Sequence, residues 1–229
     1  MDVYFLHIFF TSKPYINLLA QRHKHVAELW ALFYIFHLDN VFKDWALQNF
    51  MYNSIIVSGL PGSGKSSLIK SLVCYYRWSV HPIGEMFRKR WGELPDPKLD
   101  FEDWWPALPH EEQLRVNREL AQIVSRGNVI ADTRYPRLCA GPNSLKVFLT
   151  APLDVRVQRA YGTKKYEGKT VEQLFALLQK RENDEVNMGM ALFGSDYRRA
   201  SDYDLVLDTG ELSPEKEFAD VINLVGPKR

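Results

Sequence analysis

The chain has 229 residues, of which 46% are hydrophobic and 25% charged, and its formal net charge is +1. This length and apolar content suffice for one sizeable globular domain, and the balanced charge argues against a nucleic-acid or membrane-surface partner. The two cysteines, Cys74 and Cys139, are too few and too isolated for a disulfide framework. We therefore expect both thiols to be free and the compartment to be reducing.

The amino-terminal segment, residues 1–51, differs from the rest of the chain. Residues 1–10 are nearly all apolar, but they include Asp2 and lack a basic start, which makes a poor signal peptide. Residues 26–38 are apolar but fall short of the about 20 residues that a membrane span needs, and Glu28 interrupts them. Two interpretations stay open: a pair of amphipathic helices docked on the domain, or a segment translated from an upstream start. The second is favoured because a strand pattern follows Met51 at once.

Four short apolar runs predict strands, at residues 54–58, 128–131, 145–149 and 205–207. Unbroken runs of this kind suit strands that are buried on both faces of a parallel sheet. Helical patterns lie between and after them, at residues 64–77, 111–126, 153–161, 171–186 and 214–224. Gly127 is placed to end the second helix, and Ser213 with Pro214 is placed to begin the last. The alternation predicts an α/β fold in three layers, with helices on both sides of a central parallel sheet.

The strongest motif is Gly-Leu-Pro-Gly-Ser-Gly-Lys-Ser at residues 59–66, which fits G-x-x-x-x-G-K-[ST]. It follows a predicted strand and opens a predicted helix, as the motif requires. Its glycines allow successive N–H groups to point at phosphate oxygens, and the helix N-terminus adds positive dipole character. Lys65 can bridge the β- and γ-phosphates, and the Ser66 hydroxyl can bind Mg²⁺. The sequence therefore predicts a site for ATP and Mg²⁺ formed by Gly59, Pro61, Gly62, Ser63, Gly64, Lys65, Ser66 and Ser67.

This motif alone does not name a reaction, because GTPases, motors and kinases share it. GTPases usually carry an N-K-x-D sequence that reads the base, and this chain has none. The distance from the motif to the end of the chain is short for a motor or an AAA-type ATPase. These features favour a small phosphotransferase.

Several charged residues follow predicted strands, where ligands bind in open α/β sheets. Asp132 ends the second strand and is placed for a Mg²⁺-bound water or an acceptor hydroxyl, while Arg88 and Arg134 could hold an acceptor phosphate bidentately. Arg159 and Arg181 lie on helices that could close over the transferring group and stabilise its charge. We predict catalytic roles for Lys65, Asp132, Arg159 and Arg181, substrate binding by Arg88, Asp132 and Arg134, and metal binding by Ser66 and Asp132.

From about Tyr52 onward the chain resembles the cytidylate kinase-like branch of the P-loop nucleoside monophosphate kinases. The resemblance rests on the P-loop, G-E-M-F-R at 84–88, D-T-R at 132–134, L-T-A-P-L-D-V-R-V-Q-R at 149–159, R-E-N-D-E at 181–185 and Y-D-L-V-L-D-T-G-E-L-S-P at 203–214. It implies a kinase domain at residues 52–229, with a helical acceptor-binding insertion near 83–127, a helical lid near 160–200 and a donor-adenine loop at 208–210. It also implies lid roles for Arg159 and Arg181.

The activity that this resemblance implies is transfer of a phosphoryl group from ATP to a nucleoside monophosphate, with CMP or dCMP as the expected acceptor. ATP-dependent chemistry on small molecules suggests a cytoplasmic enzyme, and we expect a monomer without nucleic-acid or membrane partners.

The chain departs from the family pattern on the acceptor side. Ile83 stands where many relatives have serine, Thr133 where glycine is common, and Asn187 and Met188 where an arginine often occurs. Two alternatives therefore stay open. One is a P-loop kinase for another small acceptor, such as a sugar acid, a shikimate-like alcohol or an antibiotic. The other is a non-catalytic nucleotide-binding module.

Overall fold

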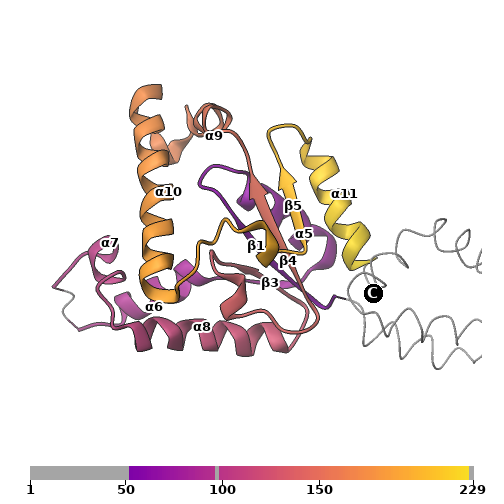
Figure 1. The fold of residues 1–229 in the computed structure, drawn as a ribbon, viewed down its shortest axis with the longest axis horizontal. Coiled ribbons are helices and arrows are strands. Elements are labelled where there is room, and N and C mark those ends of the chain that lie inside the picture. Colours follow the sequence, from indigo (N-terminus) through magenta and orange to yellow (C-terminus); the bar gives the residue numbers. More distant parts are fainter. Residues whose placement is uncertain (1–51, 96–97, 227–229) are drawn as a thin grey trace, which may run out of the picture. The chain divides into compact units, whose positions relative to one another are not determined.

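The computed structural model describes residues 52–95 and 98–226, and Figure 1 shows them as a sheet flanked by helices. The two interpretations of residues 1–51 lie outside the described residues. Within the described part, no helix combines the length and the apolar character needed to cross a membrane.

The sheet has five parallel strands in the order β2-β3-β1-β4-β5. The four strands predicted from apolar runs are confirmed as β1 Ser54–Gly59, β3 Val129–Asp132, β4 Ser144–Thr150 and β5 Leu205–Asp208. A fifth, β2 Ser79–Pro82, was not predicted, because its sequence S-V-H-P has no apolar run. It is an edge strand that pairs only with β3, and an edge tolerates both its exposure and its terminal proline.

The helices of the described part are α5 Lys65–Tyr76, α6 Ile83–Gly92, α7 Phe101–Trp104, α8 His110–Ser125, α9 Leu153–Ala160, α10 Val171–Phe193 and α11 Pro214–Val225. The helices predicted from the sequence are confirmed as α5, α8, α9, α10 and α11, whereas no helix range was predicted for α6 or α7. Ser213 caps α11 by accepting from the Lys216 amide, as predicted. α10 continues past the predicted end at residue 186 to Phe193, where Gly194 takes a left-handed conformation with φ 60°.

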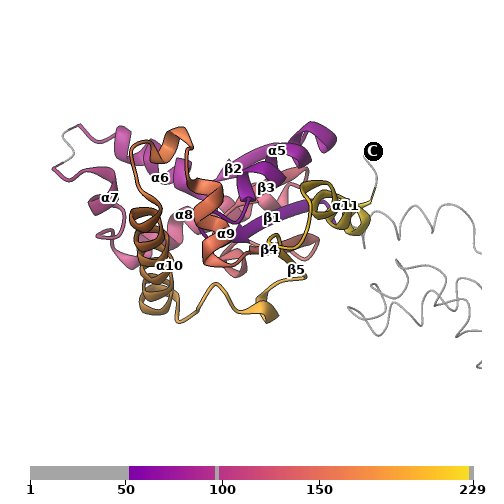
Figure 2. The same ribbon diagram turned by 90° about the horizontal axis from the view of Figure 1, so that it is seen from above.

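Alternating side chains of β1 divide the core into two layers. Ile55 and Val57 face α5 and α11 on one side of the sheet, whereas Ile56 faces α8 on the other, and all three are fully buried. Figure 2 shows α5 and α11 next to each other beside the sheet. The three-layer α/β arrangement is therefore confirmed.

The long helix α10 stands at the side of this sandwich. At its beginning it packs on α9 around a small core of Val157, Ala160, Leu174 and Leu178. At its end the Phe193 ring lies 5.8 Å from the His110 ring of α8. Figure 1 shows α10 running from α9 toward α6 and α8. Because α9 follows β4, this path takes α10 past the carboxyl ends of the central strands.

Candidate active site

The loop between β1 and α5 has the backbone that the glycine-rich motif predicts. Gly59, Gly62 and Gly64 have φ values of 151°, 82° and 92°, which residues other than glycine rarely adopt. A Cβ at Gly59 would also collide with the carbonyl oxygen of Leu149 on the neighbouring strand β4. Within the described residues, no side chain caps α5 and no acidic residue lies in its first turn. The helix N-terminus is thus open to an anion.

The residues of this loop fit a bound polyphosphate with magnesium. The Ser63 hydroxyl is buried without a hydrogen-bond partner among the described residues, and Ser66 and Ser67 are exposed at the start of α5. The described part of the chain has no cluster of three or more His, Cys, Asp or Glu side chains that would hold a metal. Ser66 and Asp132, the residues predicted to bind the metal, would hold magnesium together with the phosphate oxygens of its nucleotide.

Lys65 and Asp132 meet at the carboxyl edge of the sheet. The Lys65 Nζ lies 3.1 Å from an Asp132 carboxylate oxygen, and both side chains are mostly buried. Burial, followed by the positive charge of Arg134, lowers the pKa of Lys65 to about 8, although Asp132 acts in the opposite direction. Burial and Arg134 thus disfavour the protonated form of Lys65, and the negative charge of a bound polyphosphate would favour it.

Arg134, two residues beyond Asp132, is held by a carboxylate from α10. Its Nε and Nη2 donate to the two oxygens of Glu185 at 2.7 and 3.0 Å, and its guanidinium lies 5.7 Å from the centre of the Tyr197 ring. Burial acts to raise the pKa of Glu185, but the charges of Arg134 and Arg181 outweigh it and leave that pKa below its usual value. Arg134 is therefore bidentately paired and firmly oriented.

The two arginines predicted to close over the site contact protein groups. Arg159 donates from Nη1 to the Thr209 hydroxyl at 2.8 Å and from Nη2 to the Thr209 carbonyl, in the loop after β5. The Thr209 hydroxyl lies 3.0 Å from the carbonyl oxygen of Ser63 in the P-loop. Arg181 is more exposed and donates from Nε to Glu185 at 3.1 Å. Their roles during transfer stay predictions.

Arg88 lies on the exposed face of α6, and its guanidinium lies 5.0 Å from the centre of the Phe101 ring of α7. The structure thus brings Lys65, Asp132 and Arg134 together and links Arg181 to them through Glu185. Arg159 instead donates to the Thr209 hydroxyl, which in turn contacts the Ser63 carbonyl of the P-loop. Arg88 lies on α6, and its contact with an acceptor stays a prediction.

Two residues of the site, Arg156 and Glu182, were not singled out from the sequence. Arg156 is 4% exposed and donates to the Ala151 carbonyl, the Pro61 carbonyl and the Glu182 carboxylate at 2.9, 3.1 and 2.8 Å. A usable signal was present, because Arg156 lies beside Val157 within the apolar face of α9. An arginine on such a face is buried and needs partners.

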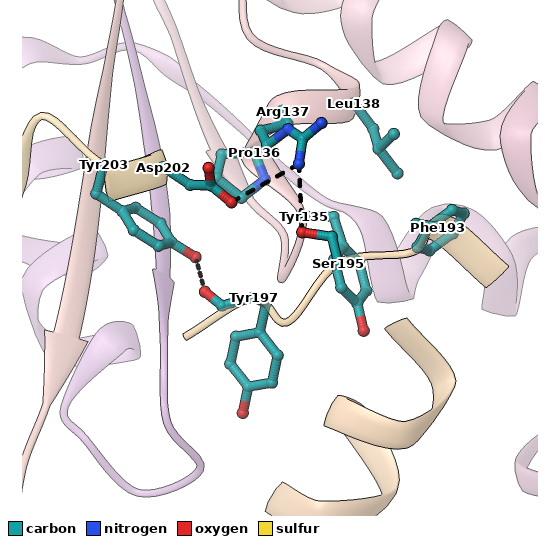
Figure 3. A pocket seen from close by; sticks show the side chains of 9 residues that line it. All are labelled: Tyr135, Pro136, Arg137, Leu138, Phe193, Ser195, Tyr197, Asp202 and Tyr203. Carbon is teal, nitrogen blue, oxygen red and sulfur yellow. Dashed lines mark hydrogen bonds and ion pairs between the residues drawn. The ribbon is translucent and has the colours of Figure 1, made fainter. Parts of the chain in front are cut away.

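A separate small pocket lies between residues 135–138 and the segment that follows α10, and Figure 3 shows it from close by. Arg137 lies between Ser195 and Asp202 at 3.4 and 4.0 Å, and the Tyr203 hydroxyl donates to the Tyr197 carbonyl. Its volume of about 30 Å³ suits a water molecule and is far too small for a nucleotide.

Comparisons with known proteins identify the family of this chain. The profile of the cytidylate kinase-like family matches residues 87–211. The cytidylate kinase of Pyrococcus abyssi is 32% identical over 165 residues, which cover 72% of this chain and 89% of that protein. The cytidylate kinase of Methanopyrus kandleri is 30% identical over 177 residues, covering 72% and 89%.

Two solved structures share the fold at low sequence identity. A shikimate kinase from Bacteroides thetaiotaomicron is 19% identical with a TM-score of 0.51, and an uncharacterized protein from Eubacterium ventriosum is 15% identical with a TM-score of 0.55. Each match covers 75% of this chain and 97% of the other. These two structures show the fold alone. The family profile and the cytidylate kinases together show that the chain belongs to the cytidylate kinase-like family and is an enzyme of the nucleoside monophosphate kinase type.

Proposed function

We propose that the protein transfers the γ-phosphoryl group of ATP to CMP or dCMP, with Mg²⁺, and forms ADP and the nucleoside diphosphate. The observation that carries this proposal is the cluster of Lys65, Asp132 and Arg134 at the carboxyl edge of the sheet, directly beside the P-loop. A donor polyphosphate on Lys65 and an acceptor phosphate near Arg134 would bring the reacting groups together. The named relatives are cytidylate kinases, which supports the choice of acceptor.

On the donor side, the backbone amides around Gly62 and Gly64 and the Lys65 ammonium would hold the β- and γ-phosphates. Bound Mg²⁺ neutralises charge on these phosphates. Lys65 is shielded from solvent, its pKa of about 8 leaves it mostly protonated at pH 7, and a bound polyphosphate would favour the protonated form further, so its interaction with developing charge would be strong.

On the acceptor side, the nucleophile is an oxygen of the acceptor phosphate. A phosphate monoester has a second pKa near 6 and is largely dianionic at pH 7, so the attack needs no general base. The work of the protein is therefore positioning and charge neutralisation. Arg134 would receive the acceptor phosphate and Asp132 would orient the acceptor or a magnesium-bound water. Arg159 and Arg181 would neutralise charge as the site closes, and Arg88 would add a contact from α6.

We propose a monomer that works in the cytoplasm on small molecules. Residues 83–127 would serve as the acceptor-binding insertion and residues 160–200 as the lid of a domain that spans 52–229.

The test is a coupled assay of ADP release by the full chain with Mg·ATP and one acceptor at a time: CMP, dCMP, UMP, AMP or shikimate. We expect the highest kcat/KM with CMP or dCMP, and negligible ADP release without an acceptor. Highest turnover with shikimate would assign the chain to kinases of another small acceptor. ATP binding without acceptor-dependent turnover would identify a non-catalytic module.

A further inference from the structure

Arg156 lies directly beneath the turn of the P-loop. A Cβ built on Gly62 would lie 3.1 Å from the Cβ and 3.2 Å from the carbonyl oxygen of Arg156. The Arg156 Nη1 also donates to the carbonyl oxygen of Pro61 at 3.1 Å. The arginine therefore contacts the loop through both its backbone and its guanidinium, at the two residues where the chain turns.

This contact fixes the direction of one amide of the loop. In a planar trans peptide the C=O and the N–H point to opposite sides. Because the Pro61 carbonyl points toward Arg156, the N–H of Gly62 points away from it, out of the packed side of the loop. Within the described part of the chain this N–H has no hydrogen-bond partner. It is thus available to an anion, and its direction depends on Arg156.

The position of Arg156 depends in turn on Glu182 of α10. The remaining nitrogen of the guanidinium, Nη2, donates to Glu182 Oε2 at 2.8 Å, while Nε donates to the Ala151 carbonyl at 2.9 Å. Arg198 donates to the other oxygen of Glu182 at 3.0 Å and is itself held by Asp196. With 4% of its surface exposed, Arg156 cannot turn to water for a partner, so Glu182 determines where it lies.

We propose that Glu182 is a positioning residue for the triphosphate, which acts through Arg156 to orient the Gly62 amide. This inference rests on the proposed function only in that the P-loop holds ATP. Among the described residues the ion-pair partners of Glu182 are Arg156 and Arg198 rather than residues of the P-loop, so its effect should vanish when Arg156 can no longer transmit it. The same helix also holds the acceptor-side arginine through Glu185, and the helix thereby supports both substrates from one face.

The test is a double-mutant cycle on the binding of a non-hydrolysable ATP analogue with Mg²⁺, measured by calorimetry on the full chain. We expect Glu182→Gln and Arg156→Lys each to raise the Kd about tenfold, and the double variant to bind no more weakly than either single variant. Glu182→Asp, which keeps the charge, should restore part of the affinity. The matched control is Asp184→Asn on the exposed face of the same helix, whose carboxylate pairs only with Lys180 among the described residues.

Additive effects in the double variant, or an unchanged or tighter Kd in Glu182→Gln, would overturn the inference. If Glu182→Gln fails to fold, the comparison of Glu182→Asp with Arg156→Lys and their combination decides in the same way. In the Glu182 and Arg156 variants the KM for the acceptor should change less than twofold, whereas a merely structural defect would weaken the binding of both ATP and the acceptor. A wild-type chain that binds no Mg·ATP analogue would instead contradict the proposed function.

Discussion

The donor and acceptor sides of the site are built in different ways. The proposed donor side is local: three glycines, Lys65 and Ser66 all lie within residues 59–66, from the end of β1 to the start of α5, and the backbone itself forms the cradle. The acceptor side is assembled from distant parts of the chain, since Arg134 and Glu185 are 51 residues apart. The cradle depends on α10 only indirectly, through Arg156 and Glu182, whereas the Arg134–Glu185 pair depends directly on how α10 packs. The predictions below test this difference.

The largest effect is expected on the donor side, from Lys65→Met. This variant removes the ammonium that would neutralise the phosphates while it keeps a chain of similar length. We expect kcat to fall about a thousandfold in the ADP-release assay with CMP. Near-normal turnover would contradict the role of the P-loop.

The acceptor side is tested by Arg134→Lys, which keeps the charge but loses the planar fork that Glu185 holds. We expect the acceptor KM to rise at least about tenfold and the KM for ATP to change little. The matched control is Arg137→Lys, three residues further on, whose arginine is more exposed and lies 4.0 Å from Asp202. Equal effects on both KM values would show that the two sides are not separate.

The packing of α10 is tested by Gly189→Ala. A Cβ at this position would collide with the Tyr135 hydroxyl and lie 2.7 Å from the Ser195 carbonyl. We expect a loss of about 1–3 kcal/mol in the free energy of unfolding, and about 2–4 °C in Tm for each kcal/mol. Gly92→Ala is the control, because nothing lies within 4 Å of its Cβ position and its φ is ordinary. If the Gly189→Ala variant were as stable as the Gly92→Ala variant, the close packing of α10 on Tyr135 and Ser195 would be contradicted.

The smallest effect is the pH dependence of nucleotide binding. The pKa of Lys65 is about 8 in the free protein, so the side chain is mostly protonated below that pH and loses its proton above it. A neutral lysine attracts phosphate less, so the Kd for the Mg·ATP analogue should rise a few-fold between pH 7 and pH 9. Binding at pH 8.5 should take up protons, which makes the calorimetric heat depend on the buffer. Constant affinity without proton uptake would contradict this pKa.

The contrast between the two sides also explains what the sequence could predict. The strands, most helix ends and the P-loop follow from apolar runs, capping residues and glycine positions, all of which act over a few residues. The edge strand β2 was missed because it is half exposed and has no apolar run. The partners of Arg156 and Arg134 were missed because both glutamates look like surface charges on a helix. Only the packing of α10 brings them to the buried arginines.

The most direct test of the account is ³¹P NMR of the full chain with Mg·ATP and CMP. We predict that ADP and CDP resonances grow at equal rates as ATP disappears, and that neither grows with Lys65→Met. Unchanged ATP and CMP, or ADP with inorganic phosphate and no CDP, would contradict phosphoryl transfer to CMP at this site.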